Sequence, residues 1–281
     1  MSAPLERRPG PTVRVRATEH RHDGAGPAPA RTRDDRVVTE EPLELRLAWP
    51  GAAARRAWVT MRTPGDDFAL ATGWALTAGH LVGPPDRVAY CTDAALTPRQ
   101  EFNVVTVTLP GPPPVPVPVH HGDHGAGSAC GVCGADSIDD AVRVARAVQR
   151  WNGPDLDPGL VPALGEQLRV HQQLFDRTGG VHAAGMLGPD GSLVQVREDV
   201  GRHNAVDKVV GARVLAGLSP ALPALVVSGR AGFELVQKAV VAGVGALVAV
   251  GAPTSLSVEL AERSGLALYA FTRPGRTVRY A

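Results

Sequence analysis

The chain has 281 residues, and its 29 Lys and Arg residues nearly balance its 28 Asp and Glu residues. This balance excludes a polybasic nucleic-acid binder and an acidic solvating protein, and a hydrophobic fraction of 44% is ordinary for a globular protein with a large core. The longest apolar stretch, residues 239–250, is shorter than the about 20 residues that cross a bilayer, so we expect no membrane contact.

Residues 1–36 differ from the rest of the chain. They carry eight arginines against five acidic residues, a net charge of +3, and show neither apolar periodicity nor the apolar core of a signal peptide. Gly24, Gly26, Pro27 and Pro29 add turn-forming residues. We therefore predict a disordered basic tail, with a docking role for it as the weaker alternative.

Residues 37–119 are predicted to form a small, mostly β subdomain. Alternating or β-branched runs predict strands at residues 37–38, 43–47, 58–61 and 103–109. A turn at residues 63–67 precedes an apolar pattern of helical spacing that ends at Gly79 and predicts one helix. Six prolines within residues 110–118 predict an extended linker.

Residues 137–281 are predicted to form an α/β domain. A helix begins at Ser137, a residue type that favours helix N-termini. Further helices are predicted at residues 164–176, 204–216, 233–242 and 255–264, and strands at residues 181–187, 193–196, 224–228, 246–250 and 266–271. Apolar strands that alternate with helices indicate a layered α/β sheet.

Cys130 and Cys133, separated by two residues and flanked by glycines, are the strongest chemical feature of the sequence. They lie within residues 120–136, a glycine-rich stretch that we expect to be a mobile loop. Together with His121 and His124 they could bind zinc, as a dithiol they could carry out redox chemistry, and as an exposed thiolate they could carry sulfur as a persulfide. The spacing by itself favours zinc slightly and leaves all three interpretations open.

The third cysteine, Cys91, is isolated, and we predict that it is a buried small hydrophobic residue. Three cysteines are too few, and odd in number, for a disulfide framework. They suit a reducing compartment, so we expect a cytoplasmic protein.

Small and basic residues lie at the ends of several predicted strands. They are Gly180 and His182, Gly229 and Arg230, and Arg273 and Arg276. Open α/β sheets bind ligands at the carboxyl ends of strands, and helix N-termini and arginine forks favour anions, so these clusters predict a site for an anionic ligand. A run of titratable residues that includes His203, Asp207 and Lys208 either lines the same cavity or forms a structural network.

Taken in chain order, these motifs resemble the FdhD/NarQ family of formate dehydrogenase accessory sulfurtransferases. The resemblance covers residues 36–281. It is carried by Glu41-Pro42-Leu43, Thr63 to Asp67, Cys130 to Gly134, Thr178 to His182, the eleven-residue run Glu198 to Lys208, Ser228 to Arg230, and Phe271 to Arg276.

The resemblance implies a sulfur carrier in which Cys130 is the persulfide-forming nucleophile and Cys133 assists it. It implies a cysteine desulfurase as sulfur donor and molybdenum bis(molybdopterin guanine dinucleotide) as bound substrate, which is then inserted into formate dehydrogenase. No permanently bound cofactor and no metal site are expected. The residues that we expect to bind the cofactor, from the resemblance and from the strand-end clusters, are Phe271, Thr272, Arg273, Pro274, Gly275, Arg276, Gly180, His182, Gly229 and Arg230.

The resemblance further implies a homodimer and a cytidine-deaminase-like three-layer α/β core with a smaller β-rich N-terminal subdomain. Deaminase chemistry itself is not expected, because Ala184 stands where the deaminase motif has a glutamate. The alternative function is a zinc-stabilised chaperone that binds the molybdenum cofactor without transferring sulfur.

Overall fold

The computed structural model describes residues 9–21, 30–92, 96–97, 100–117, 142 and 149–281. The predicted loop at residues 120–136, with Cys130 and Cys133, and all but one residue of the helix predicted from Ser137 to residue 148 lie outside this part of the chain. No helix within it is long and apolar enough to cross a membrane.

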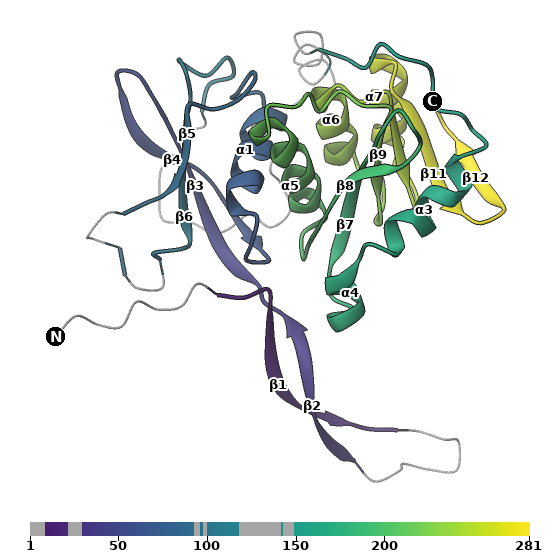
Figure 1. The fold of residues 1–281 in the computed structure, drawn as a ribbon, viewed down its shortest axis with the longest axis horizontal. Coiled ribbons are helices and arrows are strands. Elements are labelled where there is room, and N and C mark those ends of the chain that lie inside the picture. The colour runs from purple at the N-terminus through teal and green to yellow at the C-terminus, as the bar shows by residue number, and fades with distance from the viewer. Residues whose placement is uncertain (1–8, 22–29, 93–95, 98–99, 118–141, 143–148) are drawn as a thin grey trace.

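A six-stranded mixed sheet forms the centre of the second half of the chain (Figure 1). Its strands are β7 (His182–Leu187), β8 (Leu193–Asp199), β9 (Ala224–Val227), β10 (Ala246–Ala249), β11 (Ala267–Arg273) and β12 (Arg276–Arg279). They lie in the order β12-β11-β10-β9-β7-β8, and β9, β10 and β11 run parallel to one another. The carboxyl ends of these three parallel strands therefore meet at one edge of the sheet.

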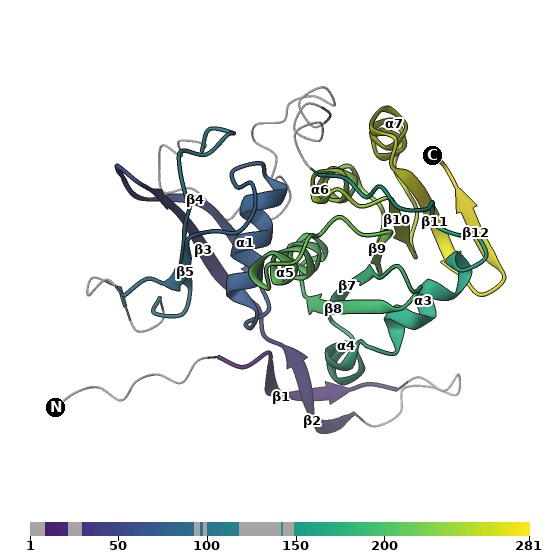
Figure 2. The same cartoon turned by 45° about the horizontal axis from the view of Figure 1, so that its top comes forward.

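Helices cover both faces of this sheet (Figure 2). On one face, α3 (Val161–Arg169) packs against side chains such as Val226 and Val248. On the other face, α5 (Arg202–Leu215), α6 (Phe233–Ala242) and α7 (Ser255–Ser264) form a larger core with the intervening strand residues. The two faces of each central strand are buried, which explains why these strands are continuous apolar runs. The predicted α/β class is confirmed.

A second, four-stranded sheet lies in the first half of the chain. Its strands are β3 (Glu41–Trp49), β4 (Ala52–Arg62), β5 (Arg87–Tyr90) and β6 (Val104–Thr108), in the order β4-β3-β6-β5. Leu43, Leu45 and Leu47 are fully buried, so the alternation seen in the sequence marks the inner face of β3. Helix α1 (Asp67–Thr77) covers this face, and the rings of Trp58 and Trp74 stack with their centroids 5.5 Å apart.

The two halves of the molecule meet where α1 crosses α5. A Cβ atom added to Gly73 of α1 would overlap the backbone carbonyl of Asp207, and one added to Gly211 of α5 would overlap the carbonyl of Ala69. Only glycine permits this reciprocal close approach of two helix backbones. The crossing therefore depends on one glycine from each helix.

The N-terminal region departs from the prediction of a disordered tail for residues 1–36. Strands β1 (Thr12–Glu19) and β2 (Arg31–Val38) form an antiparallel ribbon that projects from the body of the molecule (Figure 1). In β1 the arginines alternate with Val and Ala, whereas β2 has the charged run Arg33 to Arg36 and is held by its pairing with β1, in which Arg16 lies opposite Asp34 and Glu19 opposite Arg31. The high charge thus concealed two strands.

The helix predicted at residues 164–176 is in fact two helices. Helix α3 ends at Arg169, and α4 (Gln173–Thr178) begins after a short break. The carboxylate of Glu198, on β8, accepts hydrogen bonds from the backbone N–H groups of Leu174 and Phe175, both at 2.8 Å. This tertiary cap satisfies donors at a helix start, and it explains why the chain begins a new helix there.

The close crossing of α1 and α5 predicts a large effect of Gly211→Ala. The added methyl group has no space, so we expect the free energy of unfolding to fall by about 3 kcal/mol or more. Urea unfolding of the purified protein measures this change. Gly111→Ala is the matched control, because a Cβ atom there meets no heavy atom within 4 Å. Equal stabilities of the two variants would contradict the proposed role of the crossing.

Candidate functional site

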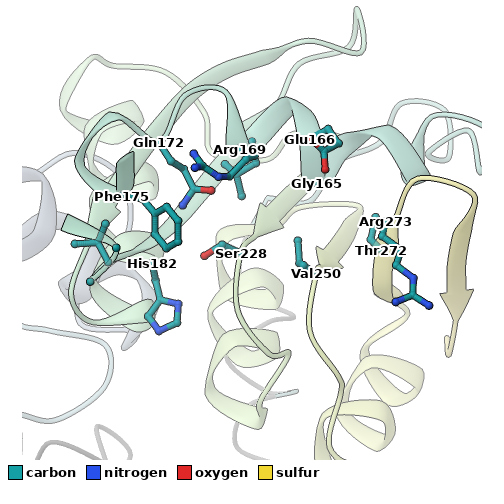
Figure 3. Close-up of a pocket in the computed structure, with 14 residues that line it drawn as sticks. Gly165, Glu166, Arg169, Gln172, Phe175, His182, Ser228, Val250, Thr272 and Arg273 are labelled. Atoms are coloured by element: carbon teal, nitrogen blue, oxygen red, sulfur yellow. The ribbon is translucent and has the colours of Figure 1, made fainter. Parts of the chain in front are cut away.

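A cavity of about 450 Å³ opens at the carboxyl ends of β9, β10 and β11, beside the amino end of β7 (Figure 3). Ser228 and Val250 directly follow β9 and β10 and form part of its wall. Its full lining is Gly165, Glu166, Leu168, Arg169, Gln172, Phe175, Gly179, Gly180, Val181, His182, Ser228, Val250, Thr272 and Arg273. The volume lies in the range of small-molecule binding sites, at the sheet edge where open α/β folds bind ligands.

Several of the residues predicted to bind the cofactor meet in this cavity. Gly180 and His182 line it at one end, and Thr272 and Arg273 line it from β11. Gly229 is adjacent, because a Cβ atom there would lie 3.4 Å from Nδ1 of His182. Residues separated by about 90 positions in the sequence thus contribute to one site.

The remaining predicted residues lie outside the cavity lining. Arg230 is exposed. Pro274 and Gly275 form the turn between β11 and β12, and Arg276 is the first residue of β12. The Arg276 guanidinium lies 5.4 Å from the ring centroid of Phe271. The predicted last strand ended at residue 271, whereas this segment belongs to the hairpin of β11 and β12. A register shift between Ala270 and Arg273 and a positive φ of 52° at Phe271 interrupt the pairing of its two strands.

Helices α3 and α4 supply residues that sequence reasoning missed. Glu166 and Arg169 come from α3, Phe175 comes from α4, and Gln172 lies at the break between them. Residues 165, 166, 169 and 172 recur at helical spacing, which is the one signal that could have found them. Leu164 and Leu168 on the same helix pack into the core, and this packing by itself accounts for the helical spacing. The polar positions beside them were therefore not predicted to contact a ligand.

Two histidines beside the cavity are held in their neutral form. Burial, followed by the nearby positive charge of Arg202, lowers the pKa of His182. Burial together with the charges of Lys238, Arg202 and His182 lowers the pKa of His203 to about 3. The closest carboxylate to His203 is that of Glu234, at 3.8 Å. At neutral pH both imidazoles therefore act as neutral hydrogen-bonding groups rather than as cations.

The titratable run that ends at Lys208 forms a structural network between the two halves of the molecule. The Lys208 ammonium lies 2.7 Å from the Asp199 carboxylate and donates to the Thr63 carbonyl at 2.8 Å. Asp199 also accepts from the Thr63 N–H group at 3.1 Å, and Asn204 donates to the Met61 carbonyl at 2.7 Å. Lys208 and Asn204 are buried and lie outside the cavity lining, so this network links the subdomains rather than forming the cavity wall.

A second buried group joins α1, α5 and α6. The Asp207 carboxylate accepts hydrogen bonds from Thr77 at 2.8 Å and from Lys238 at 2.8 and 2.9 Å. Burial raises the pKa of Asp207, and the neighbouring Lys238 charge opposes that shift. Asp207, like Lys208, thus belongs to a buried hydrogen-bonded network and not to the cavity wall.

Of the three cysteines, the structure describes Cys91. Cys130, Cys133, His121 and His124 lie outside the part of the chain that the structure describes. Cys91 is half-buried rather than fully buried, and its Sγ lies 3.7 Å from a guanidinium nitrogen of Arg46. Within the described ranges, no group of three or more His, Cys, Asp or Glu residues is arranged to hold a metal ion.

The fold and the cavity are those of an α/β protein with a ligand-sized site at the carboxyl ends of parallel strands. The model of the FdhD/NarQ family matches residues 38–281, and the chain belongs to this family.

Similar proteins agree with this assignment. The chain is 44% identical over 281 residues to the sulfur carrier protein FdhD of Streptomyces avermitilis, covering 95% of this chain and 94% of the relative. It is 44% identical over 280 residues to the protein of the same name from Streptomyces coelicolor, with the same coverage. The crystal structure of a proposed formate dehydrogenase accessory protein from Desulfotalea psychrophila superimposes with a TM-score of 0.67 at 21% identity. That alignment covers 95% of this chain and 96% of the other, so the fold is shared.

The lowered pKa of His203 predicts a stability that falls in acid. The usual pKa of 6.5 applies to the unfolded chain, so between pH 6.5 and about 3 the unfolded state binds the proton and the folded state does not. This contribution is complete above pH 6.5 and is lost as the pH falls, by about 2 kcal/mol at pH 5. Urea unfolding at pH 7.5 and pH 5 should show a smaller loss for His203→Asn than for wild type. The exposed His171→Asn is the control, and an unchanged pH dependence in His203→Asn would contradict the prediction.

Proposed function

We propose that this protein is a sulfur carrier that supports formate dehydrogenase. It accepts persulfide sulfur from a cysteine desulfurase and passes it to molybdenum bis(molybdopterin guanine dinucleotide) before that cofactor enters formate dehydrogenase. The observation that carries the proposal is the 44% identity, over nearly the whole chain, to curated relatives named sulfur carrier protein FdhD.

The first chemical step is a thiolate exchange on sulfur. The Cys130 thiolate attacks the outer sulfur of the desulfurase persulfide and forms a new sulfur–sulfur bond. The bond between that sulfur and the desulfurase cysteine breaks, and the desulfurase thiolate leaves. No electrons are gained or lost overall, and the product is a persulfide on Cys130.

The second step delivers sulfur at the oxidation level of sulfide, which requires two electrons. We propose that the Cys133 thiolate attacks the inner sulfur of the Cys130 persulfide and forms a Cys130–Cys133 disulfide. The outer sulfur leaves as hydrosulfide, loses its proton to solvent and becomes a sulfido ligand of the molybdenum. The two cysteines supply the electrons, and a dithiol reductant restores them.

The cavity at the strand ends is the proposed binding site for one nucleotide arm of the cofactor. Gly180, His182, Thr272 and Arg273, all candidates from the sequence, lie together in its wall. A volume of about 450 Å³ suits a nucleotide-sized ligand, so the pterin and the metal would extend beyond it. Arg273 supplies a guanidinium fork for phosphate oxygens.

We further propose that the protein works as a homodimer in the cytoplasm, as the family resemblance implies. Helices on both faces of the six-stranded sheet support a cytidine-deaminase-like arrangement of the α/β domain.

The persulfide proposal predicts a covalent adduct at Cys130. After incubation with a cysteine desulfurase and cysteine, the intact mass of the wild-type protein should increase by one sulfur atom. Cys130→Ala should show no increase, the control Cys91→Ala should behave as wild type, and Cys133→Ala should retain the adduct because the releasing thiolate is missing. A wild-type protein that gains no sulfur without added reductant would overturn the proposal. Stoichiometric zinc that is lost in His121→Ala would support the chaperone alternative instead.

The cavity proposal predicts that Arg273→Ala weakens the binding of guanosine diphosphate. Hydrogen bonds to a charged group contribute about 1.5–3 kcal/mol, so we expect a loss of tenfold or more in affinity by titration calorimetry. Arg276→Ala, from the same hairpin, is the matched control and should have a smaller effect, because Arg276 lies over Phe271 and not in the cavity wall. Equal effects of the two changes would place the phosphates elsewhere.

A further inference from the structure

The ribbon formed by β1 and β2 has one apolar face. Residues directly opposite each other in an antiparallel pair lie on the same face of the ribbon, and successive residues alternate between its two faces. Val13 lies opposite Val37, and Val15 follows two positions later, so the three valines share a face. Their exposed fractions are 49% for Val13 and 37% for Val15 and Val37. Arg33 and Asp35, on the same face, form an ion pair of 3.0 Å, so their charges offset each other and the valines remain its dominant exposed feature.

The other face of the ribbon is basic. Arg14 lies directly opposite Arg36, and Arg16 lies opposite Asp34, so three guanidinium groups share this face with one carboxylate. All three arginines are exposed, and within the described ranges none of their guanidinium groups is ion-paired. Like charges directly opposite each other destabilise a strand pair, so an anionic partner on this face would relieve the repulsion.

The ribbon stands apart from the two larger sheets. It forms a two-stranded sheet of its own and projects from the body of the molecule (Figure 1). A two-stranded ribbon in water is at best marginally stable, and a segment that exposes valines on one face and unpaired arginines on the other is typical of a surface that a partner covers. A protein partner suits this combination better than a nucleic acid, because nucleic acids are bound chiefly through phosphates and give the valines little to contact.

The basic face of the ribbon begins at the rim of the cavity. Val38 lies two residues after Arg36 and so belongs to the same face. A Cβ atom added to Gly180, which lines the cavity, would lie 3.2 Å from a methyl carbon of Val38. At a rise of about 3.3 Å per residue, Arg36 and the opposite Arg14 stand about 7 Å beyond this contact. A protein that binds the basic face is therefore held beside the cavity.

We propose that this ribbon is the docking arm for apo-formate dehydrogenase, the enzyme that receives the cofactor. The inference rests on the proposed function, in which the nucleotide arm of the cofactor lies in the cavity before the cofactor is passed on. The basic face binds an acidic surface of the apoenzyme, and Val13, Val15 and Val37 pack on an apolar surface beside it. Complementary charges speed the encounter and fix the orientation of the two proteins, and docking at the cavity rim gives the cofactor a short path between them.

Charge reversal at Arg14 tests the docking arm. Arg14→Glu places a carboxylate opposite Arg36, which favours strand pairing, so a loss of binding would not come from a weakened ribbon. We expect about tenfold weaker affinity of the full-length variant for apo-formate dehydrogenase of the same organism, because the new carboxylate faces an acidic surface. Arg14→Lys keeps the charge and should bind nearly as wild type. Biolayer interferometry measures these affinities, and circular dichroism establishes that the variants are folded.

The matched control and the apolar face use the same assay. Arg55→Glu makes an equal change in net charge at an exposed arginine of β4, outside the ribbon, and should bind as wild type. Val13→Thr combined with Val15→Thr keeps strand-forming residues but removes apolar surface, and should weaken the affinity severalfold. If Arg55→Glu weakens the affinity as much as Arg14→Glu, the effect belongs to net charge and the docking arm is wrong.

The outcomes separate this inference from the proposed function. If wild type binds apo-formate dehydrogenase and Arg14→Glu binds it equally well, the ribbon is not the docking arm and the proposed function stands. If Arg14→Glu keeps this affinity but no longer takes up sulfur from the cysteine desulfurase, or no longer binds a duplex DNA that wild type binds, the ribbon has another partner and the inference is again overturned. If wild type neither takes up sulfur nor binds apo-formate dehydrogenase, the proposed function itself fails.

Discussion

The close crossing of α1 and α5 is the constraint on which the rest of the structure depends. Gly73 and Gly211 bring the helix backbones into contact, and this contact sets the distance between the four-stranded and the six-stranded sheets. Around it, buried groups of α5 reach the first half of the chain: the Asp207 carboxylate accepts from Thr77, and Lys208, which is paired with Asp199, donates to the Thr63 carbonyl. Breaking a buried ion pair leaves an uncompensated charge, which is far more costly than losing an exposed pair. The two halves of the chain therefore form one body.

This crossing also positions groups at the candidate site. The amino end of α5 carries Arg202 and His203, and His182 lies beside them on β7. Burial lowers the pKa of both imidazoles; the positive charge of Arg202 lowers it further at His182, and the charges of Lys238 and Arg202 lower it further at His203, so both are neutral. The cavity thus borders on the neutral imidazole of His182 and on the guanidinium of Arg273.

The sequence predicted regular elements well where one local pattern dominated. Leu43, Leu45 and Leu47 marked the buried face of a strand, and the helices at residues 233–242 and 255–264 lie where their spacing placed them. Prediction failed where distant residues decide the local conformation. The break before α4 depends on the Glu198 carboxylate, which no window around α4 contains, and the N-terminal ribbon depends on pairing across an intervening segment. The candidate site followed the same rule: glycines and arginines at strand ends were found, whereas Gln172 and Phe175 were not.

The sequence by itself determined the family and the α/β class, because these depend on residue types at short, fixed spacings, and the chemistry of its cysteine pair stays a prediction. Only the tertiary structure decided which of the candidate residues are structural and which face a cavity. Asp207 and Lys208 became parts of buried ion pairs, while Thr272 and Arg273 came to lie opposite His182 and Gly180. The physical reason is that the burial and charge environment of a side chain are set by the elements packed around it. Those elements come from distant parts of the chain, and local sequence does not encode their arrangement.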